Sequence, residues 1–136
     1  MKAENRSQLM DQLGAVQANT VWSWCAVNDE ERKVYFSVWA DLVHKHAGEN
    51  RYTIQEPGWG IDEAGCRSPA RNDHDEKLRL VFEQGYEPYG YFIEAQDPTA
   101  HPRQIAGIRT SFVMRLRLVR ADGGSIYGVP LERVEL

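Results

Sequence analysis

Tryptophan is the residue type in this chain that most clearly suggests a binding site, since four tryptophans occur among 136 residues. Their flat aromatic faces can stack on a planar base or hold a cationic ligand. Trp22, Trp24 and Trp39 fall in segments rich in β-branched and aromatic residues, where packing in a sheet core is the alternative role. Trp59 lies instead in the glycine-rich segment 56–65. The sequence therefore predicts an aromatic binding surface drawn from these four side chains.

Trp59 has no regular pattern of neighbours that would bury it. The glycines on either side of it allow a close approach of the backbone to a ligand. We therefore expect Trp59 to be partly exposed at the rim of the main concave pocket and to contribute to ligand or partner binding. The alternative is that the loop folds back and places Trp59 against the following helix as a lid on the core.

Acidic and basic residues near these aromatics could complete a binding site. Asp41 and Asp62 are candidates to accept a hydrogen bond from an exocyclic amine of a ligand. Arginine forks hold phosphate by paired hydrogen bonds. The candidate phosphate-binding arginines are Arg103, Arg115 and Arg117. A solvated strand face, or pairing with Glu132 and Glu135 on a neighbouring strand, is the alternative role for the arginines.

The run Asp73-His74-Asp75 offers a third kind of chemistry, a small metal-dependent hydrolase that uses His74. The spacing matches no HExxH, paired CxxC or HNH arrangement, and His74 falls on the apolar face of its helix, which favours a buried structural histidine. The chain also has no P-loop, GxGxxG or GxSxG motif. We therefore expect no metal and no cofactor, and binding without catalysis.

Sheet-forming segments dominate the chain. Strands are predicted at 20–27, 33–39, 51–55, 89–95 and 110–120, with one or two edge strands over 125–136. A short helix is predicted over 6–17, a helical turn within 40–50, and the clearest helix over 69–84, with Ser68 and Pro69 at its start and Gly85 after its end. The 20–39 hairpin carries large apolar groups on both faces, so we expect it to be covered on both sides or to line a pocket.

The resulting expectation is an α+β fold, a mainly antiparallel curved sheet or small open β-barrel with the long helix packed on it. Seven apolar residues that share a face on their elements are predicted to form its core. They are Leu78, Val81, Phe82, Phe92, Phe112, Met114 and Leu116.

Length and composition suggest a single domain over 1–136. No apolar run is long enough for a membrane span and no secretion signal is evident, so a cytoplasmic protein with two free thiols is expected. The net charge of −4 is unlike that of a dedicated non-specific nucleic-acid binder, although a local basic face can coexist with it.

Several motifs together resemble a little-characterised bacterial family, found as standalone proteins and as domains beside HNH-type nucleases. The motifs are WSWCAV (22–27), VYFSVWAD (34–41), RNDHDEKLRLVFEQG (71–85), YGYFIEAQD (89–97) and PRQI (102–105). The broader arrangement is similar to PUA-like modules of the EVE, ASCH and SRA type. This resemblance implies a small β-barrel that reads nucleic acid, in some cases a flipped modified base held in an aromatic pocket.

The leading hypothesis is a binding module for modified DNA or RNA bases. An accessory subunit that binds a protein partner, such as a nuclease, through Trp59 is the second hypothesis. The His74-dependent hydrolase is the third.

Overall fold

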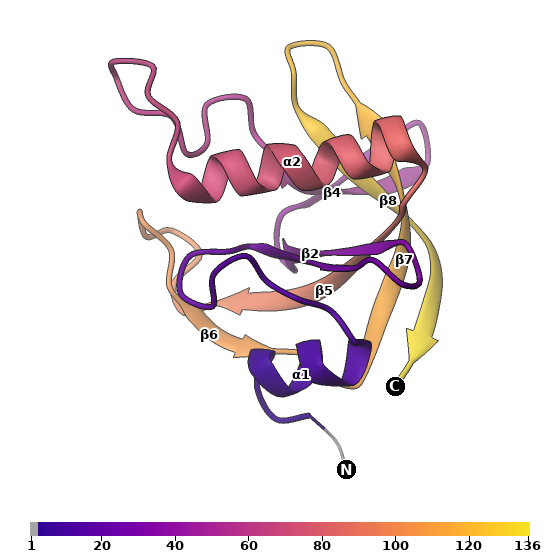
Figure 1. Cartoon of the computed structure of the whole chain (residues 1–136). Coiled ribbons are helices and arrows are strands. Elements are labelled where there is room, and N and C mark those ends of the chain that lie inside the picture. The colour runs from indigo at the N-terminus through magenta and orange to yellow at the C-terminus, as the bar shows by residue number, and fades with distance from the viewer. Residues whose placement is uncertain (1–2) are drawn as a thin grey trace.

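A computed structural model describes residues 3–136, which form two helices and one sheet of eight strands (Figure 1). The elements are α1 (Arg6–Leu13), β1 (Cys25–Asn28), β2 (Lys33–Trp39), β3 (Val43–His46), β4 (Glu49–Gln55), α2 (Pro69–Gln84), β5 (Glu87–Ala95), β6 (Ile105–Ile108), β7 (Phe112–Arg120) and β8 (Ile126–Glu135). The predicted α+β class is confirmed. Within residues 3–136, neither helix has the length and apolarity needed to cross a membrane.

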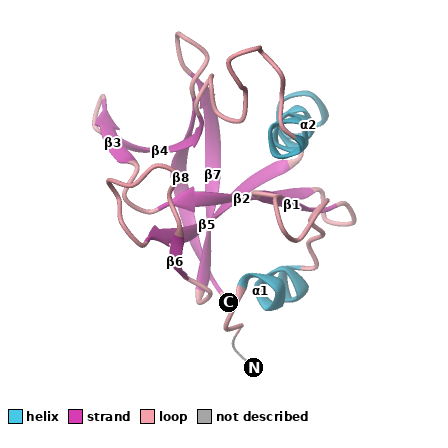
Figure 2. Ribbon diagram, turned by 90° about the vertical axis from the view of Figure 1, so that its left-hand side faces the viewer, coloured by secondary structure: helices cyan, strands magenta, loops and turns pink. Residues whose placement is uncertain are grey.

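The strands follow the order β1-β2-β5-β7-β8-β4-β3, and β6 pairs with β5. Only β2 and β5 run parallel among the paired strands of the described chain, so the mainly antiparallel prediction is confirmed. Because β2 and β5 are parallel, both end on the same side of the molecule, which is turned toward the viewer in Figure 2. The prediction that 125–136 lies at an edge is wrong, since β8 is paired on both sides by β7 and β4.

Helix α1 is shorter than predicted because Gly14 ends it. Gly14 adopts a left-handed conformation with φ 66°, and its amide and that of Ala15 bond back to the carbonyls of Asp11 and Met10. A glycine pays no steric penalty there, which makes it the preferred residue just after a helix.

Two other segments differ from the prediction. The strand predicted over 20–27 begins only at Cys25, because the Asn19 carboxamide accepts from the amides of Val21 and Trp22 and folds residues 20–24 into turns. Residues 40–50 form no helical turn. They form most of the β3–β4 hairpin, a projection on the opposite side of the sheet from α2 in Figure 2.

Helix α2 begins and ends as the sequence predicts. The Ser68 hydroxyl accepts from the amide of Arg71, Pro69 occupies the first turn, and Gly85 ends the helix at φ 74°. The helix packs on β1 and β2, while α1 covers the other face of the same strands (Figure 1). The hairpin is therefore covered on both sides, one of the two predicted alternatives, although β1 lies at an edge of the sheet.

The core has two parts, one on each face of β2. Tyr35 joins the cluster beneath α1, and Val34, Phe36 and Val38 join the cluster beneath α2. Four of the predicted core residues are buried, namely Leu78, Phe92, Phe112 and Leu116. Three others, Val81, Phe82 and Met114, are only half-buried. Phe82 lies at the border of the core, where the Arg120 guanidinium covers its ring at 3.9 Å.

Gly90 marks the tightest contact within the sheet. A Cβ at this position would lie 2.9 Å from Cγ2 of Val38 and 3.1 Å from Cδ1 of Leu116. We expect Gly90→Ala to lower the free energy of unfolding by about 1–3 kcal/mol, as overpacking does, in a denaturant titration. Gly107→Ala is the control, since no atom lies within 4 Å of its Cβ position. Equal midpoints for the two variants would show that this part of the core is looser than the structure has it.

Candidate functional site

A pocket of about 310 Å³ opens beside the end of β2, where tryptophans from three separate segments meet. This volume is at the lower end of small-molecule sites, which span roughly 300–1,000 Å³. Its aromatic wall is formed by Trp24, Trp39 and Trp59. The other lining residues are Ser37, Leu42, Thr53, Ile54, Gln55, Glu56, His74, His101, Pro102 and Arg103.

The three tryptophans are half-buried and keep part of their rings open to the pocket. Trp24 and Trp39 lie with ring centroids 6.0 Å apart, tilted by 44°. Trp59 lies edge-on to the imidazole of His74 at 5.2 Å. Trp59 is thus partly exposed and lines the pocket, as predicted, and the loop also folds back onto α2, as the alternative had it. Its role in binding stays a prediction.

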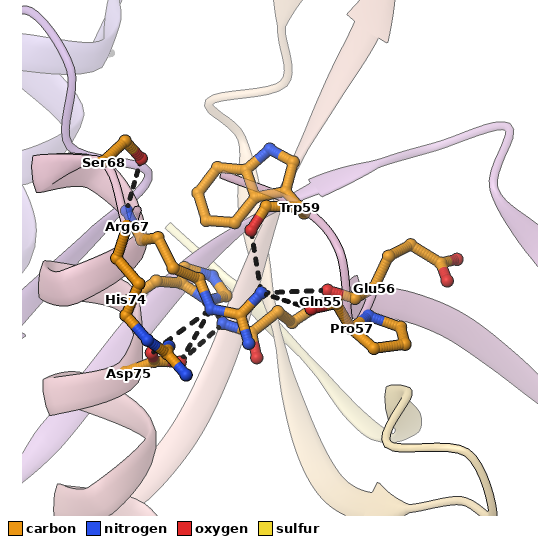
Figure 3. Close-up of polar contacts among 9 residues, drawn as sticks. Gln55, Glu56, Pro57, Trp59, Arg67, Ser68, His74 and Asp75 are labelled. Atoms are coloured by element: carbon orange, nitrogen blue, oxygen red, sulfur yellow. Dashed lines mark hydrogen bonds and ion pairs between the residues drawn. The ribbon is translucent and has the colours of Figure 1, made fainter. Parts of the chain in front are cut away.

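Arg71 of α2 holds the Trp59 loop in place by binding three of its residues, Glu56, Pro57 and Trp59, which are labelled in Figure 3. Its Nη1 donates to the carbonyls of Glu56, Pro57 and Trp59 at 3.2, 3.0 and 2.7 Å. Its Nε donates to Asp75 at 3.1 Å within the same helix. The guanidinium is almost fully buried, so one side chain replaces the hydration of three loop carbonyls and fixes the loop.

Gly60 lets the loop approach the helix closely. Its φ is +71°, and a Cβ there would lie 2.8 Å from Cβ of Arg71. Both conditions favour glycine over any larger residue. The amide of Ser68 bonds the Gly60 carbonyl at 2.8 Å, which closes the loop just before α2 begins.

The polar part of the pocket consists of a linked amide and imidazole. Nε2 of Gln55 donates to Nδ1 of His74 at 2.9 Å and to the Asp75 carboxylate at 3.1 Å. Because the Asp75 carboxylate can only accept, the Gln55 amide faces it with its nitrogen. The same nitrogen donates to Nδ1 of His74, so the imidazole proton is assigned to Nε2 of His74. Among residues 3–136, neither Nε2 of His74 nor Oε1 of Gln55 has a hydrogen-bond partner. The pair leaves one donor and one acceptor for a ligand.

His74 is neutral at physiological pH. Burial lowers the pKa of its imidazole to about 4, against the opposing pull of Asp75 and Asp73. A general base works best with a pKa near the working pH. His74 is therefore suited to donate a hydrogen bond from Nε2 and poorly suited to accept a proton.

The carboxylates beside His74 are occupied. Asp73 forms a buried ion pair with Lys77 at 2.9 Å and accepts from the thiol of Cys25 at 3.4 Å. Burial raises the pKa of that thiol, which keeps it protonated. Asp75 is engaged by Arg71, Gln55 and Arg67. In the described part of the chain, no three His, Cys, Asp or Glu side chains are grouped so that they could hold a metal ion.

Arg103 lines the pocket, but its guanidinium is already paired. Nη1 and Nη2 donate to the two carboxylate oxygens of Asp41 at 2.7 and 2.8 Å. The guanidinium also lies 5.2 Å from the ring centre of Trp39. The hydrogen bonds from Arg103 lower the pKa of the Asp41 carboxyl. Asp41 thus anchors Arg103 and does not line the pocket, contrary to the role predicted for it.

Four other predicted site residues do not line the pocket. Trp22 is carried away from it by the turn at Asn19. Asp62 accepts from two amides of its own loop, at Ala64 and Cys66. Arg115 and Arg117 lie on β7 and pair with glutamates, Glu132 at 3.6 Å and Glu49 at 2.8 Å. The pairing of Arg115 with Glu132 is the predicted alternative, whereas the partner of Arg117 is Glu49 of β4, two strands away, and not Glu135.

Gln55 and Arg71 are the residues of the candidate site that the sequence did not reveal. Gln55 ends a strand directly before the glycine-rich loop, which is the only local signal of its position. Comparisons with protein-family models, curated proteins and solved structures found no match to this chain.

Substitution of Arg71 tests whether the position of the Trp59 loop depends on one buried guanidinium. Its removal leaves the carbonyls of Pro57 and Trp59 without a donor and takes from Asp75 its buried arginine, so Arg71→Ala should lose about 3–5 kcal/mol of unfolding free energy and make Trp59 more accessible to acrylamide quenching. The ion pair of Arg67 with Asp75 is far more exposed, and Arg67→Ala should cost less than about 1 kcal/mol. Equal, small losses in the two variants would contradict the role given to Arg71.

The neutral state of His74 makes stability depend on pH. Its folded pKa of about 4 lies below the roughly 6.5 of an unfolded histidine, so the unfolded chain gains the proton first as the pH falls. The part of the unfolding free energy that depends on a neutral His74 is fully present above about pH 6.5. It should be lost toward pH 4, by on the order of 3 kcal/mol. Urea midpoints across this range should show a smaller pH slope in His74→Gln and an unchanged slope in His101→Gln. A histidine NMR titration with His74 near its ordinary pKa would refute this.

Proposed function

We propose that this chain is a binding module that takes a planar heteroaromatic group, of the kind found in nucleic-acid bases, into the tryptophan-walled pocket. One observation carries the proposal: Trp24, Trp39 and Trp59 converge on one pocket that also holds a neutral, oriented hydrogen-bonding pair. Stacking on aromatic side chains contributes about 1–3 kcal/mol per base. The donor of His74 and the acceptor of Gln55 would then read an edge of the ring.

The chemistry of the pocket favours an uncharged ring. Arg103 on the lining is paired with Asp41 and His74 is neutral, so Glu56 is the one charged lining side chain without an ion pair among residues 3–136. A base edge offers an acceptor beside a donor, which complements the donor and acceptor of His74 and Gln55. The aromatic wall can also accept an added methyl group, worth about 0.8 kcal/mol when buried. We therefore propose modified DNA or RNA bases as the ligand class.

The mostly antiparallel open sheet with two helices agrees with the PUA-like resemblance, and we propose that the chain is such a module. Binding without catalysis is part of this proposal. Its support is that His74 is a weak base and that Asp73 and Asp75 are engaged by basic side chains.

Binding can be measured by tryptophan fluorescence and calorimetry with the common nucleosides, their base-methylated forms and short oligonucleotides that contain them. We expect saturable binding, tighter for a methylated form. Trp24→Leu, Trp39→Leu and Trp59→Leu should each lose about 1–3 kcal/mol of binding free energy. Trp22→Leu is the matched control and should bind as the unaltered protein does.

Two results would count against the proposal. The first is no saturable binding of any nucleoside or oligonucleotide by the folded protein. The second is an equal loss in Trp22→Leu, because Trp22 does not line the pocket.

A further inference from the structure

The β3–β4 hairpin carries two basic side chains that have no acidic partner. Lys45 is exposed and Arg51 is half-exposed, and neither forms an ion pair with any of residues 3–136. Nε of Arg51 is shielded from solvent and has no hydrogen-bond partner within the same residues. The one glutamate of the hairpin, Glu49, is bound by Arg117 of β7 at 2.8 Å. The hairpin therefore has a net positive charge, although the chain as a whole carries −4.

The hairpin leads directly into the pocket. Its two strands pair in register, with His44 opposite Arg51 and His46 opposite Glu49. The next pair along the same face is Leu42 with Thr53, joined by a backbone hydrogen bond of 3.1 Å, and both residues line the pocket. Successive pairs on one strand face are about 6.6 Å apart. Arg51 thus lies one such step from the pocket wall.

The arginines predicted to hold phosphate have carboxylate partners, unlike the two basic residues of the hairpin, Lys45 and Arg51. Arg103 is bound by both oxygens of Asp41, Arg115 by Glu132 and Arg117 by Glu49. A phosphate would have to displace a carboxylate from each of them. Lys45 and Arg51 require no such exchange, and Arg51 shares the hairpin face that carries Leu42 and Thr53, whereas Lys45 lies on the opposite face.

We propose that the β3–β4 hairpin binds the phosphate backbone of the nucleic-acid strand whose base enters the pocket. Arg51 neutralises the phosphate beside that nucleotide, and Lys45, on the other face of the hairpin, neutralises a phosphate further along the strand. This inference rests on the proposed function, because the strand is placed by its base. It replaces Arg103, Arg115 and Arg117 as the phosphate ligands.

The test is the salt dependence of binding to a fluorescein-labelled single-stranded DNA, measured by fluorescence anisotropy between about 50 and 200 mM salt. Each neutralised phosphate contributes about 0.7 to the slope of log affinity against log salt for a single strand. The double variant Lys45→Gln/Arg51→Gln should reduce the slope by about 1.4 and weaken binding to all sequences alike. Arg79→Gln is the matched control, since Arg79 is an exposed arginine on α2 without an ion pair in the described chain, and it should leave the slope unchanged.

Two further measurements keep the test decisive. Arg51→Lys retains the charge and should retain the slope, and size-exclusion chromatography will show whether the double variant stays folded and unaggregated. Binding of a free nucleoside, which has no phosphate, should be the same in every variant. An unchanged slope in the double variant, or equal binding of poly-glutamate, would overturn the inference while leaving nucleoside binding intact. Absence of nucleoside binding by the unaltered protein would instead overturn the proposed function.

Discussion

The ion pair between Arg71 and Asp75 holds together the two halves of the candidate site. Asp75 orients the amide of Gln55, which in turn orients His74. Arg71 binds the carbonyls of the loop that carries Trp59. Both charged groups are largely shielded from water, where an unpaired partner would be strongly destabilising. This one ion pair within α2 therefore fixes the loop that carries Trp59 and the Gln55–His74 pair relative to each other.

The charged groups inside the pocket differ in their pairing from those on the adjoining hairpin. Inside the pocket, Arg103 is paired with Asp41, His74 stays uncharged because it is buried, and Glu56 is the one lining charge without an ion pair among residues 3–136. Outside it, Lys45 and Arg51 on the adjoining hairpin are free of acidic partners among the described residues. Such an arrangement suits a ligand with an uncharged planar ring and a charged backbone. It also explains how an acidic chain could bind nucleic acid through a small basic surface.

Apolar patterning was enough to predict the interior strands β2, β5 and β7 and the helix α2, because each carries a run of apolar side chains that packs in the core. It failed for residues 40–50, because β3 is an exposed edge strand with no buried side chain to create a pattern. It also failed for residues 20–24, where the turn at Asn19 overrides strand-forming residue types. The tryptophan pocket was predictable from residue type, but Gln55 and Arg71 were not. Their roles arise from contacts between distant segments, which no local spacing encodes.

The most direct test of the aromatic pocket is the NMR response of the four tryptophan indole N–H signals to a bound nucleoside. Each signal can be assigned by substituting its tryptophan, and Trp22 serves as an internal control. The account predicts that the signals of Trp24, Trp39 and Trp59 shift together along one saturation curve while that of Trp22 stays in place. Shifts confined to Trp22, or no shift in any of the four at saturating nucleoside, would contradict it.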